Sequence, residues 1–88
     1  MALFPIDRSY DQDLPGVRFR AIVGGDTFGC AITVDALVTR YGAKQRQSEQ
    51  ILQAFDRNRA AIEHIAKTLI AQNPSEPHRL VVIRSADC

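Results

Sequence analysis

Apolar and polar residues alternate through the segment 17–33, on either side of a central Gly24-Gly25. Two successive glycines supply the positive φ angles of a tight two-residue hairpin loop. That loop sets a register in which Phe19 faces Cys30, and one face of the hairpin is then almost wholly apolar. The other face carries Arg18, Arg20, Ile22, Thr27, Gly29 and Ala31. The pattern therefore predicts a β-hairpin.

The spacing of the apolar residues changes to that of α-helices after the hairpin. Thr33 can cap a short helix over residues 34–41, which ends before Gly42. Ser48 can cap a long helix over residues 49–72, in which apolar side chains recur every three or four positions and form one stripe. Both helices can therefore cover the apolar face of the hairpin.

Asn58 interrupts the apolar stripe of the long helix. An unpaired buried amide costs about 1 to 3 kcal/mol, so we expect Asn58 to form a hydrogen bond. It either satisfies a backbone group at the end of the short helix or in a loop, or lines a ligand pocket together with Arg59. We favour the first interpretation, because buried polar side chains are usually paired within the protein.

The two ends of the chain complete the predicted fold. Residues 1–16 are expected to form a short edge strand, ended by Pro5, and a polar loop. Successive apolar residues predict a last strand over residues 79–84, which runs parallel to the second hairpin strand and can add antiparallel beside the first. The sequence thus predicts a single α+β domain over residues 1–88. Its mainly antiparallel sheet has three or four strands, and both helices pack on one face.

Composition narrows the class of protein. Of the 88 residues, 45% are hydrophobic and 24% are charged, which is typical of a small globular domain. A domain of this size buries only about 60 to 65% of its unfolded surface, so a partner subunit would add stability. The net charge of +1 gives no general attraction to nucleic acids or anionic membranes. Because no segment resembles a signal peptide or a membrane span, we expect a cytoplasmic protein with reduced cysteines.

The glycine-rich hairpin does not match a phosphate-binding loop. A P-loop needs lysine and then serine or threonine after its second glycine, where this chain has Cys30 and Ala31. A buried Cys30 is expected to act as a small hydrophobic side chain with a raised pKa. Cys30 and Cys88 lack metal-ligand spacing, and neither histidine is placed to serve as a base. We therefore expect no catalytic residue, no metal site and no cofactor.

Short motifs follow one another in order over nearly the whole chain: FP near the start, DRSYD, VRF, the glycine hairpin, TVDAL and AFDRNRAAIEHIA. Together they resemble the small bacterial family called domain of unknown function 1488. This chain has Arg20-Ala21-Ile22 after VRF, where some members have aromatic residues, so no aromatic site is carried over. The resemblance implies a compact α+β domain and brings no established activity, cofactor or catalytic residue.

Three classes of function remain. The first is a non-catalytic interaction or structural module that forms a homodimer through Arg18, Arg20, Ile22, Gly29 and Ala31. The second is a nucleic-acid-binding or regulatory protein that uses Arg18, Arg20, Arg79 and Arg84 on a sheet face. The third is an enzyme that uses Cys30 or His64. We favour the first, because sheets that bind RNA expose aromatic residues and no two residues here have the spacing of a catalytic site.

Overall fold

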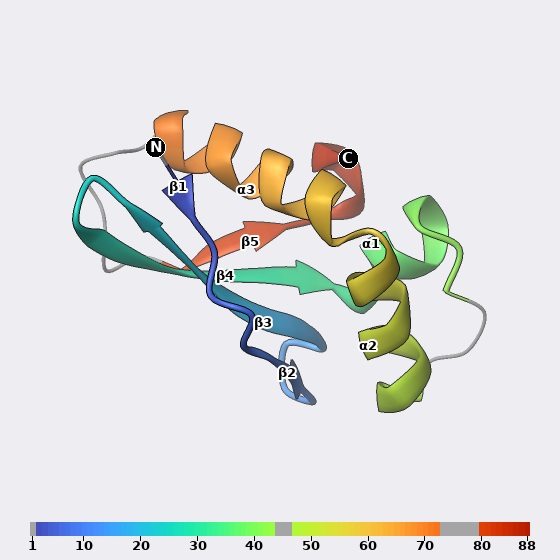
Figure 1. The fold of residues 1–88 in the computed structure, drawn as a ribbon. Coiled ribbons are helices and arrows are strands. Elements are labelled where there is room, and N and C mark those ends of the chain that lie inside the picture. Colours follow the sequence, from blue (N-terminus) through green and yellow to red (C-terminus); the bar gives the residue numbers. More distant parts are fainter. Residues whose placement is uncertain (1, 44–46, 73–79) are drawn as a thin grey trace.

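The computed structural model describes residues 2–43, 47–72 and 80–88, and it shows one sheet with helices packed against it (Figure 1). The strands are β1 (Ala2–Leu3), β2 (Arg8–Asp11), β3 (Gly16–Val23), β4 (Asp26–Thr33) and β5 (Val81–Ile83). The helices are α1 (Val34–Arg40), α2 (Ser48–Arg57) and α3 (Arg59–Gln72), and a 3-10 turn η1 (Ser85–Asp87) follows β5. The fold is therefore α+β, as the sequence predicts.

The hairpin of β3 and β4 forms the centre of the sheet. Gly24 and Gly25 make its loop with φ angles of 59° and 87°, a region that other residues rarely adopt. The register pairs Phe19 with Cys30, as a two-residue loop requires. β4 leads directly into α1. The Thr33 hydroxyl accepts a hydrogen bond from the backbone N–H of Ala36, in the first turn of α1, at 3.1 Å. The predicted hairpin, its register and the short helix are confirmed.

The sheet is four strand positions wide. β1 and β2 pair with different parts of one edge of β3, β4 pairs with the other edge, and β5 pairs with β4. β5 runs parallel to β4, as predicted, but its predicted position beside β3 is wrong. β1 and β2 already occupy that edge of β3, so β4 offers the edge to which β5 pairs. Within the predicted span 79–84, β5 covers Val81–Ile83, and residue 79 lies outside the described residues.

The prediction of one long helix over residues 49–72 is wrong, because α2 and α3 are separated at Asn58. Asn58 has φ −114° and ψ 17°, and its side-chain amide donates a hydrogen bond to the Ala54 carbonyl at 2.8 Å. The expected hydrogen bond therefore forms, but the predicted partner at the end of the short helix or in a loop is wrong, because the carbonyl belongs to α2 itself. Asparagine is slightly unfavourable inside helices, because its side chain competes with the backbone for hydrogen-bonding groups in this way. The break lets α2 pack against β2 and β3 while α3 packs against β4 and β5.

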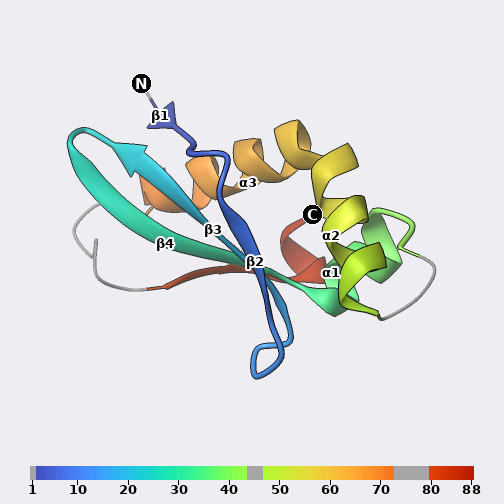
Figure 2. The ribbon, with the colours of Figure 1, turned by 60° about the horizontal axis from the view of Figure 1, so that its bottom comes forward.

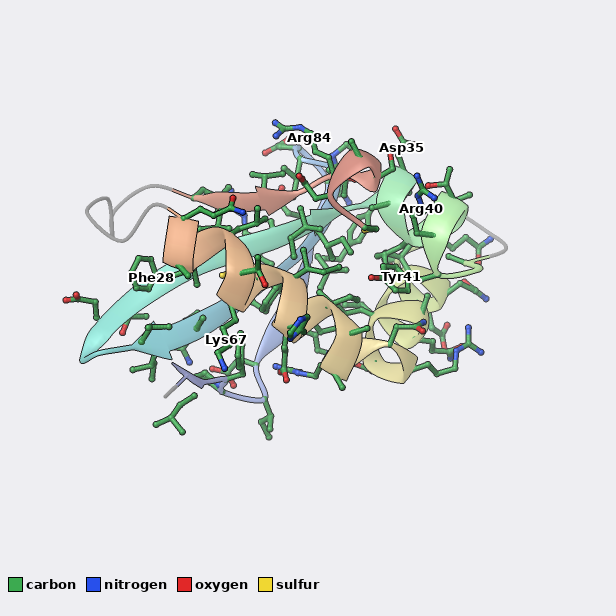
Figure 3. All side chains as sticks on the ribbon, turned by 90° about the horizontal axis from the view of Figure 1, so that it is seen from above. Phe28, Asp35, Arg40, Tyr41, Lys67 and Arg84 are labelled. Atoms are coloured by element: carbon green, nitrogen blue, oxygen red, sulfur yellow. The ribbon has the colours of Figure 1, made fainter. Side chains whose placement is uncertain are left out.

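The hydrophobic core lies between the helices and one face of the sheet. The largest fully buried side chains come from both layers: Val17, Cys30, Ile32 and Ile83 from strands, and Val34, Leu37, Ile51, Phe55 and Ile62 from helices. All three helices lie on the same side of the strands (Figure 2), and in the view onto that side α3 crosses over them (Figure 3). We call the opposite side of the sheet, which no described helix covers, the outer face.

Candidate functional site

The outer face carries the residues that the sequence singled out for an interface. Alternation along the strands turns Arg18, Arg20 and Ile22 of β3 outward, opposite Ala31, Gly29 and Thr27 of β4. The same alternation adds Leu3 from β1, Ser9 from β2, and Leu80 and Val82 from the β5 segment. The structure thus brings the five predicted interface residues onto one face and surrounds them with side chains from both ends of the chain.

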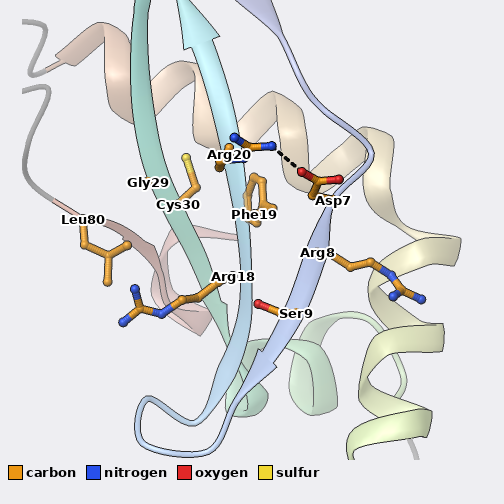
Figure 4. Close-up of a pocket in the computed structure, with 9 residues that line it drawn as sticks. All are labelled: Asp7, Arg8, Ser9, Arg18, Phe19, Arg20, Gly29, Cys30 and Leu80. Atoms are coloured by element: carbon orange, nitrogen blue, oxygen red, sulfur yellow. Dashed lines mark hydrogen bonds and ion pairs between the residues drawn. The ribbon is translucent and has the colours of Figure 1, made fainter.

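A hollow of about 260 Å³ opens on this face (Figure 4). Ser9, Arg18, Arg20 and Leu80 are among the residues that line it, together with Gly29. A Cβ atom placed on Gly29 would meet only Leu80 within 4 Å, at an ordinary contact distance of 3.5 Å. The depth of the hollow therefore results in part from the missing side chain at Gly29.

The two outward arginines are paired with carboxylates of the same chain. Arg18 Nε lies 2.5 Å from Asp11 Oδ2, and Arg20 forms an ion pair with Asp7 (Figure 4). A hydrogen bond from the backbone of Asp13, and then one from Arg18, lower the pKa of Asp11, so this carboxyl stays ionised. These two pairs contribute two positive and two negative charges, which cancel. The outer face therefore carries charged groups of both signs but no net positive charge from these two pairs.

Ala31 differs from the other predicted interface residues, because it has no accessible surface. Its neighbours across the sheet are Arg18 and Val82, and Figure 4 shows Arg18 extending across β4 toward β5. Of the remaining predicted interface residues, Arg18, Arg20 and Gly29 are exposed and Ile22 is half-buried. Ala31 therefore lies beneath its neighbours on the outer face, and a partner cannot contact it.

Arg59 lies on the helix side and holds the N-terminal segment in place. Its Nη1 donates to the Ile6 carbonyl at 3.0 Å, its Nη2 to the Pro5 carbonyl at 2.5 Å, and its Nε to the Glu63 carboxylate at 2.8 Å. Its guanidinium carbon also lies 5.2 Å from the centre of the Phe55 ring. All three guanidinium nitrogens are engaged, so Arg59 is a structural clamp. It does not line the hollow, and neither does its neighbour Asn58.

The residues considered for catalysis belong to different elements and differ in exposure. Cys30 is fully buried on the helix side of β4, and burial raises the pKa of its thiol to about 11. Cys88 is a free, exposed thiol after η1, and His64 is exposed on α3. Within residues 2–43, 47–72 and 80–88, no group of three or more His, Cys, Asp or Glu side chains could hold a metal ion. No helix of that described part is long and apolar enough to cross a membrane.

Residues 3–82 match the family described as "Protein of unknown function (DUF1488)". The chain belongs to this family. It is also similar to a crystal structure of a protein of unknown function from the DUF1488 family of Shewanella loihica PV-4, with a TM-score of 0.77 and 29% sequence identity. That similarity covers 91% of this chain and 90% of the other. No curated protein shows significant similarity. The resemblance inferred from the motifs is confirmed, and these comparisons assign no activity.

Sequence reasoning missed several residues that complete the outer face of this DUF1488 protein. Asp7 and Asp11 neutralise its arginines, and Leu80 forms part of the wall of the hollow. The motif DRSYD contains both aspartates, but its mixed polar residues do not alternate with apolar ones, so it gave no strand signal. The sequence predicts Leu80 within the last strand, but its place beside Gly29 depends on which edge of the hairpin that strand joins.

Proposed function

We propose that this DUF1488 protein is a non-catalytic interaction module that acts as a homodimer through the outer face of its sheet. The observation that carries the proposal is the asymmetry of the sheet: three helices cover one face, and no helix of the described residues covers the other (Figure 2). Among the described residues, the exposed large hydrophobic side chains are Leu3, 58% exposed, and Ile6, 87% exposed. Both lie in the N-terminal segment, and Leu3 lies directly opposite Ile22 in the sheet.

The charges of the outer face favour a second copy of the chain as the partner. A two-fold interface brings the same patch of two subunits together, so the patch must be complementary to itself. The ion pairs Arg18–Asp11 and Arg20–Asp7 place positive and negative groups side by side on one face. In a two-fold dimer, each guanidinium can approach a carboxylate of the second copy as well as the aspartate with which it pairs in its own chain. A uniformly basic or acidic face would instead repel a second copy.

The dimensions of the face limit the area that a dimer can bury. β3 and β4 each run for eight residues, but β5 has three and β1 and β2 together have six. At about 3.3 Å along a strand and about 4.8 Å between strands, the paired strands cover about 400 Å² on each copy. A face-to-face dimer thus buries about 800 Å² in total, below the range of stable specific interfaces and in that of weak ones. We therefore expect a dissociation constant in the micromolar range.

Analytical ultracentrifugation from low micromolar to about 100 µM tests the proposal, because that range spans the expected dissociation constant. Ile22→Glu places a charge on the outer face at a half-buried position and should weaken the dimer at least about tenfold. Ala61→Glu is the matched control, since Ala61 is exposed on α3, on the helix side. It should associate like the wild type. A wild-type protein that stays monomeric over the whole range would refute the proposal.

Nucleic-acid binding is a second candidate, favoured by the exposure of Arg18 and Arg20 at successive outward positions of an uncovered sheet. Both arginines are already paired with aspartates, and the outer face presents no aromatic side chain among the described residues. Arg84 is exposed, and Arg79 lies outside the described residues. We therefore expect only weak, non-selective binding of single-stranded RNA at about 150 mM salt, with a shallow salt dependence. Selective nanomolar binding in an anisotropy titration would favour this candidate over the homodimer.

A further inference from the structure

We infer that the two copies of the chain interlock, with Leu3 and Ile22 of each copy filling the hollow at Gly29 of the other. This inference rests on the homodimer proposed above and names the side chains that carry it. We call the pair Leu3 and Ile22 the ridge. Three observations support the interlock: the ridge is apolar and accessible, the hollow has the size to receive it, and the two features are neighbours on one face.

The ridge forms because two branched aliphatic side chains are direct partners in adjacent strands. Leu3 of β1 faces Ile22 of β3, and Leu3 is 58% exposed while Ile22 is half-buried. Directly opposed residues of antiparallel strands have Cβ atoms about 4.5 to 5.5 Å apart, so their side chains form one continuous apolar surface. A single exposed leucine is common, but two adjacent aliphatic side chains beside a hollow form a patch that gains from burial.

The hollow has the volume to receive the ridge, and its lining includes an apolar side at Leu80 as well as charged residues. It measures about 260 Å³, and a cavity of about 150 Å³ already admits a benzene molecule. It therefore has room for the ends of one or two branched aliphatic side chains. Gly29 contributes no side chain, and Leu80 supplies an apolar wall beside it. Arg18 and Arg20 lie around it with half of their side-chain surface exposed, where their charged ends can stay hydrated.

Ridge and hollow lie close enough together for a closed dimer. Ile22 and Arg20 are successive outward positions of β3, about 7 Å apart along the strand, and Gly29 lies directly opposite Arg20. A two-fold axis parallel to the face and between these features exchanges ridge and hollow between the copies. Both contacts then form in the same dimer. The Arg20–Asp7 pair lies beside these contacts, where it can pair with its counterpart in the second copy.

Gly29→Val tests the interlock, because it places a side chain in the hollow at a position where a Cβ atom meets only Leu80 within 4 Å. Gly29 lies in a strand with no positive φ angle, and the added Cβ meets Leu80 at an ordinary distance. Valine also favours strands more than glycine does. We expect an unchanged or higher melting temperature together with a dimer at least about tenfold weaker. A merely misfolded variant would instead show a lower melting temperature.

Two further variants complete the ultracentrifugation experiment. Leu3→Ala trims the ridge and should weaken the dimer about threefold to tenfold. Ala61→Val adds the same type of side chain as the hollow-filling variant, but on the exposed helix side, and should not change association. If the wild type dimerises and Gly29→Val and Leu3→Ala associate equally well, the interlock is wrong and the homodimer stands. If the wild type is monomeric, both proposals are wrong.

Discussion

Replacing Arg59 with alanine tests what holds the N-terminal segment against the helices. The guanidinium donates to the carbonyls of Pro5 and Ile6, pairs with Glu63 and lies over the ring of Phe55. The segment it holds includes β1, which pairs with the end of β3 through only two residues. Because so short a strand has little pairing of its own, we expect the clamp to determine whether β1 stays in the sheet.

The expected loss follows from the contacts of Arg59. A hydrogen bond that involves a charged group contributes about 1.5 to 3 kcal/mol, and a partly exposed cation–π contact about 0.5 to 1 kcal/mol. The ion pair with Glu63, four residues along the helix, contributes about 0.3 to 0.5 kcal/mol. The freed carbonyls regain water when the arginine is removed, so the contributions do not simply add. We expect Arg59→Ala to lower the free energy of unfolding by about 2 to 4 kcal/mol, which shifts the melting temperature by about 10 to 25 °C.

Urea denaturation and amide hydrogen exchange measure the two consequences. Exchange should accelerate at Leu3 and Ile22, where β1 pairs with β3, before the rest of the hairpin is affected. Arg59→Lys keeps the charge but loses the planar fork that reaches two carbonyls, so it should recover less than half of the lost stability. Glu63→Gln removes only the ion pair and serves as the control. An Arg59→Ala variant that loses less than about 0.5 kcal/mol, with unchanged exchange at β1, would refute the clamp.

Three other predictions concern the buried thiol, a crowded glycine and an ion pair. A thiol reagent should modify Cys88 at once in the native protein and Cys30 only after unfolding, because Cys30 is buried and the pKa of its thiol is raised to about 11. Rapid labelling of Cys30 in the native protein would contradict this. Gly16→Ala should cost more than about 3 kcal/mol in urea denaturation, since its Cβ would overlap a backbone carbonyl of β4; near-native stability would show that the strands can shift apart. Hydrogen bonds from Arg8, at 3.0 and 2.9 Å, lower the pKa of Asp56, so their stabilisation is present above about pH 4 and is lost as the pH falls through the lowered pKa. Asp56→Asn should therefore flatten the fall in melting temperature below about pH 4, and a profile parallel to that of the wild type would exclude this contribution.

The arrangement of the hairpin could be predicted from the sequence residue by residue. A loop of two glycines leaves only one register that gathers the apolar side chains on one face, and the structure has that register. The cap at Thr33 and the extent of α1 followed from equally local signals. The face that carries Arg18, Arg20 and Gly29 was predictable for the same reason, because the direction of a strand side chain depends only on its position in the alternation.

The break at Asn58 shows where such local signals end. The sequence identified Asn58 as a polar residue within an apolar stripe, and it also identified the need for a hydrogen bond. It could not show that the helix would end there, because an asparagine inside a helix costs only a fraction of a kcal/mol in propensity. The outcome depended on α2 and α3 packing against different strands, which the local sequence does not specify.

The position of β5 and the shape of the outer face were decided by tertiary structure alone. β5 pairs with β4 because β1 and β2 occupy the free edge of β3, and this competition involves segments from opposite ends of the chain. Ala31 is inaccessible because its sheet neighbours Arg18 and Val82 flank it, and the hollow has a wall because Leu80 arrives beside Gly29. A strand or a helix can be predicted from neighbouring residues, because backbone geometry fixes the spacing at which side chains share a face. Which edges and faces meet depends on the packing of distant segments, for which alternative pairings have similar local energies.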